Sequence, residues 1–227
     1  MTIADNLHHI QGRIAAAARR VDRNATAIRL VAVSKTKPAA AVREALQAGQ
    51  PLFGENYVQE LLAKAVEVDG EVEWHFIGSL QSNKVKHLVG KVTMIHSVDR
   101  LTLAQEIDRQ WGKQQQSCDI LMEVNLAGET SKGGASEAEA MELVRQIAML
   151  PNLRVRGLMT MPPFFDDPEA ARPYFRRLRE LSQKIAAKEI PGVEMNELSM
   201  GMSGDFEVAI EEGATLVRVG SAIFGGR

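Results

Sequence analysis

The chain has almost no cysteine, no marked excess of either charge, and no long hydrophobic run. One cysteine, Cys118, cannot form an internal disulfide and argues against a cysteine-ligated metal centre, and it fits a reducing compartment. No apolar stretch approaches the roughly 20 residues that span a bilayer. The N-terminus also lacks the basic start and apolar segment of a signal peptide. We therefore expect a cytoplasmic protein without a membrane partner.

The balance of charge excludes another class of partner. Lys and Arg number 27 and Asp and Glu 29, so the net charge of -2 gives no basic surface for nucleic acid. Hydrophobic residues make up 45% and charged residues 25%, which is the ordinary balance of a globular protein. A chain of 227 residues also has the usual length of one α/β barrel. We expect one domain over residues 1–227.

Short apolar or β-branched runs alternate along the chain with stretches of helical periodicity. The pattern predicts eight strands, at Leu30–Ser34, Leu52–Phe53, Glu73–Ile77, Thr93–Ser97, Ile120–Asn125, Arg154–Leu158, Glu194–Leu198 and Leu216–Val219. It predicts helices at Asp5–Arg20, Ala40–Ala48, Tyr57–Val68, Gln81–Leu88, Leu101–Trp111, Glu137–Leu150, Pro168–Lys188 and Phe206–Glu212.

Eight strand–helix units in this length favour a (β/α)₈ TIM-type barrel with an extra N-terminal helix. The rival is an open, doubly wound sheet. It is less favoured because no glycine-rich phosphate loop follows the first strand.

Barrel enzymes carry their sites at the carboxyl ends of the strands, and Lys35 ends the first strand. Strand alternation places Lys35 on one face with Val31 and Val33. If that face points inward, the amine lies at the barrel mouth, where it could act as a Schiff-base nucleophile. A lone lysine at a strand end more often reaches solvent, so this interpretation depends on the rest of the site.

Small residues follow the seventh and eighth strands, which is the usual place of a phosphate cradle in this fold. The candidates are Ser199, Ser203, Gly220 and Ser221. Ordinary turns and helix caps have the same composition, so each loop alone is weak evidence for a phosphate site. The two loops together, in these two places, are stronger evidence.

Arg218 lies inside the eighth strand, where its charge must face the barrel mouth, pair with a carboxylate or lose hydration. One function would be to contact the ring nitrogen of a cofactor. Arginine gives up its proton with great difficulty, so it would leave a pyridine nitrogen unprotonated and the ring a poor electron sink.

Other polar residues allow two interpretations each. His75 in the third strand is a catalyst or, more often for a lone histidine, a hydrogen-bonded core residue, and no residue at zinc-ligand spacing supports a metal. Asn56 holds a cofactor oxygen or caps the following helix. Lys84 and Lys86 form an anion patch or, in the better interpretation, a solvated helix face.

Six segments together resemble the pyridoxal 5′-phosphate (PLP) homeostasis protein family, also called YggS-like proteins. They are Val-Ala-Val-Ser-Lys-Thr-Lys-Pro (31–38), Phe-Gly-Glu-Asn-Tyr-Val-Gln-Glu (53–60), Glu-Trp-His-Phe-Ile-Gly-Ser-Leu-Gln-Ser-Asn-Lys (73–84), Arg-Gly-Leu-Met-Thr-Met (156–161), Leu-Ser-Met-Gly-Met-Ser-Gly-Asp (198–205) and Val-Arg-Val-Gly-Ser-Ala-Ile-Phe-Gly (217–225). They occur in order over nearly the whole chain. The resemblance implies a barrel like the N-terminal domain of alanine racemase.

The resemblance also implies the roles of the site residues. Lys35 would hold PLP as a Schiff base, and Arg218 would face the pyridine nitrogen. The loops at Ser199–Ser203, which include Met202, and at Gly220–Ser221 would contact the phosphate. Asn56 and His75 would lie near the cofactor. Ser221 departs slightly from the family pattern, since many relatives carry threonine there and a serine hydroxyl serves equally.

Three functions are open at this point. The resemblance implies a PLP carrier or regulator that serves PLP-dependent apoenzymes without established turnover. A PLP-dependent amino-acid racemase is the first alternative, but we expect no second, β-rich domain and identify no second acid–base group. A cofactor-free Schiff-base aldolase is the other, and it lacks an identifiable acid–base pair beside Lys35. Without the second domain that builds a racemase dimer, we expect a monomer.

Overall fold

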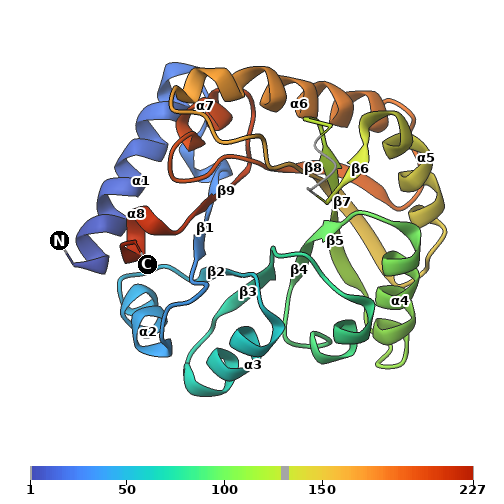
Figure 1. Ribbon diagram of the computed structural model, residues 1–227, viewed down its shortest axis with the longest axis horizontal. Coiled ribbons are helices and arrows are strands. Elements are labelled where there is room, and N and C mark those ends of the chain that lie inside the picture. Colours follow the sequence, from blue (N-terminus) through green and yellow to red (C-terminus); the bar gives the residue numbers. More distant parts are fainter. Residues whose placement is uncertain (1, 129–132, 227) are drawn as a thin grey trace.

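The computed structural model describes residues 2–128 and 133–226, and eight parallel strands form a closed barrel at the centre of this part (Figure 1). The barrel strands are β1 (Arg29–Val33), β2 (Leu52–Glu55), β3 (Glu73–Phe76), β4 (Met94–Val98), β5 (Cys118–Asn125), β7 (Leu153–Met159), β8 (Val193–Ser199) and β9 (Leu216–Val219). They pair in the order β4-β3-β2-β1-β9-β8-β7-β5, and β4 pairs with β5 to close the ring. The predicted (β/α)₈ barrel is confirmed.

Every predicted strand is present, with ends displaced by a few residues at most. The shortest prediction, Leu52–Phe53, continues to Glu55. A two-residue strand, β6 (Ala135–Ser136), was not predicted and pairs with β5 outside the ring.

The helices surround the barrel (Figure 1). They are α1 (Ile3–Arg20), α2 (Ala39–Gln47), α3 (Val58–Glu67), α4 (Leu101–Gly112), α5 (Glu137–Ala148), α6 (Arg172–Ala186), α7 (Phe206–Glu211) and α8 (Ser221–Phe224), with 3₁₀ turns η1 (Ala25–Ala27), η2 (Ser82–His87) and η3 (Pro168–Ala171). The extra N-terminal helix, α1, packs against α7, α8 and α2. None of the helices in the described ranges has both the length and the apolar character to cross a membrane.

Two helix predictions need correction. The segment predicted as a helix at Gln81–Leu88 is the 3₁₀ turn η2, in which Val85 is the buried residue, so the segment has little apolar face to hold a longer helix. The predicted helix Pro168–Lys188 is divided into η3 and α6. Pro173 causes the division, because it has no N–H to continue a helix from Pro168 and fits only in a first turn.

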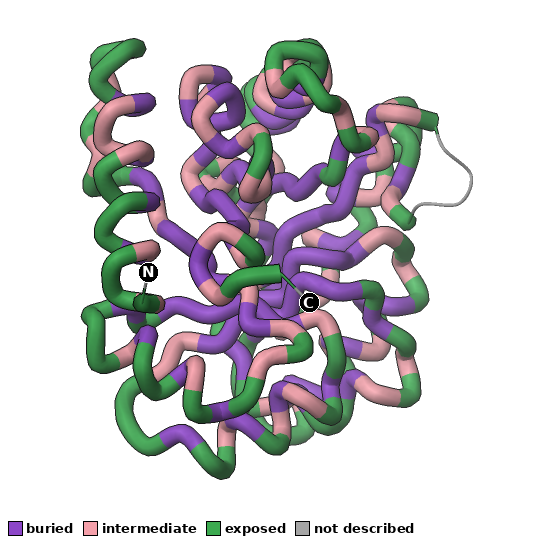
Figure 2. The backbone as a smooth tube through the Cα atoms, turned by 60° about the vertical axis from the view of Figure 1, so that its left-hand side comes forward, coloured by how far each residue is buried: buried purple, intermediate pink, exposed green. Residues whose placement is uncertain are grey.

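Strand side chains alternate between two apolar layers. Val31 belongs to a small cluster inside the barrel with Leu52, Met94, Leu121, Met159 and Leu216. Its neighbour Ala32 belongs to the large cluster between the strands and the helices. Figure 2 shows the result: buried backbone follows the strands, and exposed turns lie at the rim. The hydrophobic effect therefore holds the helices against the barrel and leaves the inward strand positions to fill its interior.

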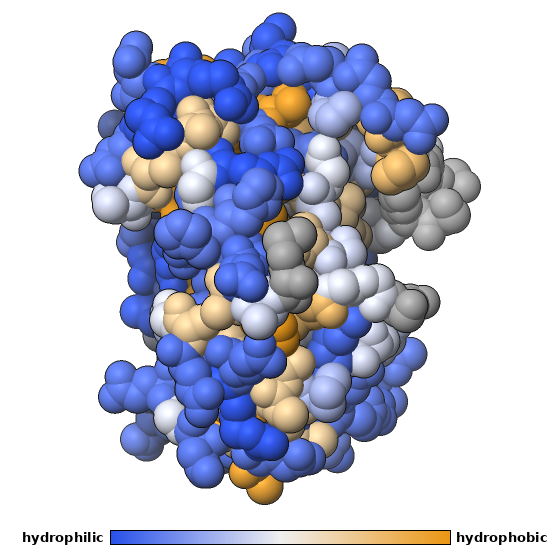
Figure 3. Space-filling model, turned by 90° about the vertical axis from the view of Figure 1, so that its left-hand side faces the viewer, coloured by the Kyte–Doolittle hydropathy of each residue, from blue (hydrophilic) through white to orange (hydrophobic). Residues whose placement is uncertain are grey.

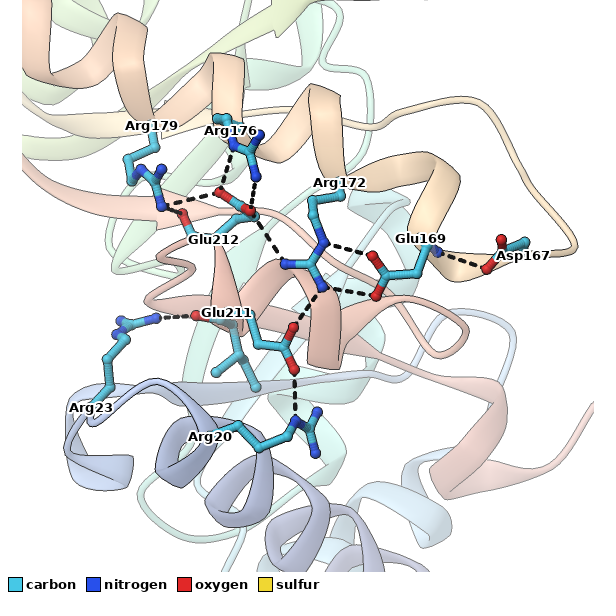
Figure 4. A network of polar contacts seen from close by, with 10 residues as sticks. Arg20, Arg23, Asp167, Glu169, Arg172, Arg176, Arg179, Glu211 and Glu212 are labelled. Carbon is cyan, nitrogen blue, oxygen red and sulfur yellow. Dashed lines mark hydrogen bonds and ion pairs between the residues drawn. The ribbon is translucent and has the colours of Figure 1, made fainter.

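A network of ion pairs ties the outer helices together (Figure 4). Glu212, with 5% of its side chain exposed, accepts contacts from Arg172 at 3.2 Å, Arg176 at 2.9 Å and Arg179 at 3.1 Å. Arg172 also pairs with Glu169 and Glu211, at 2.6 Å each. Arg172 is the first residue of α6, so these ion pairs fix the start of α6 against α7. They thereby anchor the end of the segment that connects β7 to α6.

Candidate functional site

A cavity of about 370 Å³ opens at the carboxyl ends of the strands. Residues from the ends of five strands and from the segment after β7 line it. They are Val33, Lys35, Thr36, Lys37, Asn56, Ile77, Met161, Pro163, Phe164, Phe165, Met202, Ser203, Gly204, Asp205, Arg218, Gly220, Ser221, Gly225 and Gly226. Of the nine predicted site residues, seven lie in this lining and two, His75 and Ser199, do not.

Lys35 reaches the cavity in the way the strand alternation predicted. Val31 lies in the barrel interior, and Val33 and Lys35 follow on the same face at the mouth. Thr36, next in the chain, has a φ of +63°, which turns the chain sharply away from the strand. Lys35 is half-buried and lines the cavity, so it lies at the mouth with part of its surface accessible.

Helix α3 pins the backbone on both sides of Lys35. The Lys64 ammonium donates to the Ser34 carbonyl oxygen at 2.7 Å and to Glu55 Oε1 at 2.6 Å. Glu60 Oε2 accepts from the Thr36 N–H at 2.7 Å. The other oxygen of Glu55, Oε2, is buried without a hydrogen-bond partner among the described residues, and burial raises the pKa of this carboxyl group.

Replacing Lys64 by methionine is expected to lower the free energy of unfolding by about 3 kcal/mol, because it leaves Glu55 buried without its cation. Urea unfolding followed by circular dichroism measures this change. Lys91→Met is the matched control at an exposed position, with an expected change below about 0.5 kcal/mol. Equal changes in the two variants would show that the buried pair contributes nothing to holding this end of β1.

The loops after β8 and β9 meet at the cavity. The Gly220 N–H donates to Ser203 Oγ at 3.4 Å, and the hydroxyl groups of Ser203 and Ser221 are 3.2 Å apart. A Cβ atom added at Gly220 would lie 3.1 Å from the Val33 carbonyl oxygen, so a side chain here would crowd the strand that carries Lys35. Gly201, at a φ of +89°, has the left-handed backbone that glycine favours. The predicted residues Met202, Ser203, Gly220 and Ser221 are therefore together at one wall.

Arg218 is almost completely buried, with 4% exposed, and still lines the cavity. Its Nη1 donates to Ser199 Oγ at 2.5 Å and its Nη2 to the Thr160 carbonyl oxygen at 2.9 Å. Burial lowers the pKa of Arg218 to about 10, while Glu123 and Asp205 oppose the shift, so the guanidinium stays charged at neutral pH. A guanidinium carries five N–H donors, and these two hydrogen bonds use two of them.

Asn56 lines the cavity close to the end of β2, and its Oδ1 atom is buried without a hydrogen-bond partner in the described parts of the chain. It does not cap α3: the residue before that helix is Tyr57, which makes no side-chain capping bond. An unpaired buried acceptor is costly, so this atom marks a place where a ligand could donate a hydrogen bond.

His75 and Ser199 lie deeper in the barrel than the cavity lining. His75 pairs in register with Gly54 and Met94, at the level of the interior apolar cluster. Ser199 is fully buried and contacts Arg218 and His96 instead of the cavity. Both residues are connected to the cavity through Arg218, by hydrogen bonds that run by way of His96 and Ser199. Lys84 and Lys86 lie on η2 and do not line the cavity.

The sequence does not single out several other residues at or near the cavity. His96 lies in the predicted strand Thr93–Ser97, and no motif around it distinguishes it from a core histidine. Lys37 reaches the cavity from the turn after β1, in which its N–H donates to the Ser34 carbonyl oxygen at 3.0 Å. Glu123 lies in β5, where burial and the neighbouring Asp99 raise its pKa to about 7. The segment of Met161 and Phe164, in which Phe164 is 85% exposed, covers the rim and gives no strand or helix signal.

These features define a (β/α)₈ barrel whose mouth joins a strand-end lysine, a buried arginine and two loops of small residues. The family described as alanine racemase, N-terminal domain, matches residues 6–227. The pyridoxal phosphate homeostasis protein of Aquifex aeolicus (strain VF5) is 47% identical over 228 residues, which cover 100% of this chain and 99% of that one. The chain belongs to the alanine racemase N-terminal-domain family and, within it, to the pyridoxal phosphate homeostasis proteins.

Solved structures agree with this assignment. PipY of Synechococcus elongatus PCC7942, solved with PLP bound, is 36% identical with a TM-score of 0.85, and the match covers 99% of this chain and 100% of that one. Alanine racemase of Clostridium difficile 630 has a TM-score of 0.75 at 14% identity, and the match covers 98% of this chain and 57% of that one. At that identity the second likeness shows the fold alone.

Proposed function

We propose that this chain binds PLP through a Schiff base on Lys35 and serves PLP homeostasis. The observation that carries the proposal is one cavity lined together by the Lys35 amine, the Arg218 guanidinium and the loops of Ser203, Gly220 and Ser221. Full-length relatives named pyridoxal phosphate homeostasis protein support it, as does PipY, whose structure holds PLP.

The lining residues fit PLP group by group. Ser203, Gly220 and Ser221 offer two hydroxyls and a close-packed backbone to the phosphate, with Met202 beside them. Arg218 meets the pyridine nitrogen, and the unpaired Asn56 Oδ1 meets a donor on the bound molecule. Bound PLP supplies an aldehyde for the lysine amine and an electron-withdrawing ring.

Arg218 favours carriage over catalysis. A guanidinium that keeps its proton leaves the ring nitrogen unprotonated, which weakens the ring as an electron sink. The cofactor is then held in a form of low reactivity, which suits storage and delivery. PLP-dependent apoenzymes are the class of recipient that such a carrier serves.

We also infer a monomer in the cytoplasm, acting as one domain. Large exposed hydrophobic residues are dispersed over separate elements, with Val66 on α3 and Met149 after α5, and those at the cavity rim belong to the site. Figure 3 shows the flank that carries α1, where hydrophilic side chains dominate and hydrophobic ones stand in small groups. A stable dimer needs a larger contiguous apolar surface. The free thiol of Cys118 fits a reducing compartment.

The test is the visible absorption spectrum of the purified protein before and after borohydride, followed by peptide mass mapping. We expect a yellow band that borohydride bleaches, with pyridoxyl mass on the peptide of Lys35 and none on Lys37. Lys37 is the internal control because it lines the same cavity, with its ammonium donating to the Gly226 carbonyl oxygen at 2.8 Å.

A colourless protein that also fails to take up added PLP would contradict the proposal. It would move the cofactor-free Schiff-base aldolase to first place, since that reaction uses the same lysine. Turnover of amino acids above the rate of free PLP would instead favour the racemase alternative.

A further inference from the structure

A chain of hydrogen bonds crosses the barrel interior below the cavity. Arg218 Nη1 donates to Ser199 Oγ at 2.5 Å, and this hydroxyl lies 2.9 Å from His96 Nδ1. His96 Nε2 lies 2.8 Å from His75 Nδ1. His75 Nε2 in turn lies 3.1 Å from Glu73 Oε1. Four strands, β9, β8, β4 and β3, each contribute to this relay.

The middle of the relay is closed to solvent. Ser199 and His96 are 0% exposed and His75 is 1% exposed, and their hydrogen bonds join them to one another and, at the two ends, to Arg218 and Glu73. Buried polar groups must find partners within the protein, so every link depends on the next one.

The two ends fix the direction of every hydrogen bond. Arg218 can only donate, and the Glu73 carboxylate can only accept. The hydrogen bond from His75 is the main cause that lowers the pKa of Glu73 to about 2, so this end stays ionised. With both rings neutral, all four bonds form only if Ser199 donates to His96 Nδ1 and each histidine carries its proton on Nε2.

Adding one proton to His75 reverses the two inner bonds: His75 Nδ1 then donates to His96 Nε2, and His96 Nδ1 donates to Ser199 Oγ, which already accepts from Arg218. Burial lowers the pKa of His75 and of His96, which keeps both rings neutral. The charged groups that act on the two rings are Arg29 on β1, Glu73 on β3, Glu197 on β8 and Arg218 on β9. A second hollow of about 250 Å³ reaches His75 and Glu73 from the opposite end of the barrel, with Arg29, Asp119, Arg156 and Glu194 in its wall.

We propose that Ser199, His96 and His75 are positioning residues that hold the Arg218 guanidinium toward the pyridine nitrogen of bound PLP. The inference rests on the proposed function, since PLP is the ligand that Arg218 meets. Ser199 holds Nη1 and the Thr160 carbonyl oxygen holds Nη2, so the guanidinium plane is fixed from two sides. Acid that reaches His75 from the opposite end reverses the relay, so that Ser199 Oγ accepts from His96 as well as from Arg218 and holds the guanidinium less firmly.

The first experiment uses the protein without PLP. Long-range ¹H–¹⁵N correlation spectra of histidine-labelled protein at pH 7.5 report the charge and tautomer of each ring, and the exposed His8, His9 and His87 provide the comparison. We expect His75 and His96 to be neutral with the proton on Nε2. A charged ring or an Nδ1 proton on either residue overturns the relay.

The second experiment uses PLP-loaded protein and two variants of His96. His96→Leu removes both hydrogen-bonding atoms, and we expect a shifted absorption maximum and PLP release about tenfold faster. His96→Gln keeps an acceptor and a donor at similar spacing and should restore both readouts to within about threefold. His87→Leu, at an exposed position, should match the wild type. If His96→Leu fails to fold, Ser199→Ala tests the same link.

The pH profile separates positioning from mere packing. Wild-type protein should release PLP faster as the pH falls below the ordinary histidine value of about 6.5, and His96→Leu should lose this dependence. A His96→Leu protein with wild-type spectrum, release and pH profile sinks the positioning role while the proposed function stands. A wild type that never takes up PLP refutes the proposed function, and with it the ligand side of this inference, whereas the spectra without PLP still decide the donor order.

Discussion

Replacing Lys35 by alanine is expected to abolish covalent attachment of PLP while the barrel stays folded. The substitution removes the amine at the mouth, and the atoms beyond Cβ line a cavity instead of filling the core. We therefore expect the free energy of unfolding to change by less than about 1 kcal/mol. Intact mass after borohydride measures the attachment, and circular dichroism during urea unfolding measures the fold.

Two matched variants make this result specific. Lys35→Arg keeps a positive charge but presents no amine that can form a Schiff base, so it should also lose covalent PLP. Lys37→Ala changes the neighbouring lysine of the same cavity and should keep full labelling of Lys35. Unchanged covalent PLP in the Lys35→Ala protein would defeat the assignment of this lysine.

The position of Lys35 could be predicted because strand alternation and the polarity of parallel barrels act locally. Val31, Val33 and Lys35 share a face by the two-residue period, and β1 ends at Val33, two residues before the lysine. Gly220 and Ser221 could be predicted for the same reason, since they directly follow the last strand. Closure of the barrel then brings these strand ends together without any further signal in the sequence.

The depth of His75 could not be predicted in the same way. Alternation shows that a residue faces the interior, but its layer depends on the stagger between strands, which only the closed barrel sets. His75 is two residues before Ile77, which reaches the cavity, and it pairs with Met94 in the layer beneath. The contact between His96 and His75 arises because β4 pairs with β3 in the closed barrel, and the sequence does not show this pairing. The relay is therefore a property of the assembled barrel.

The need for glycine at position 157 could not be predicted either, because the sequence does not show which residue lies opposite it in the sheet. It lies in β7, where the pairing with both adjacent strands shifts register. A Cβ atom built on Gly157 would lie 1.8 Å from the carbonyl oxygen of Glu197 in β8, far inside any tolerable contact. Glycine inside a strand often marks such a close approach of two backbones.

Gly157→Ala is accordingly expected to lower the free energy of unfolding by on the order of 5 kcal/mol, since β7 and β8 must move apart to admit the methyl group. Gly12→Ala is the matched control: it makes the same change in α1, where an added Cβ meets nothing within 4 Å, and should stabilise the protein by about 0.5–1 kcal/mol. Urea unfolding of both variants beside the wild type gives the two values. A loss below about 1 kcal/mol in Gly157→Ala would mean that the β7–β8 contact is looser than described. A loss of the expected size would show that β7 and β8 are in tight backbone contact at Gly157. This is the position at which the register shifts, two residues before the end of β7.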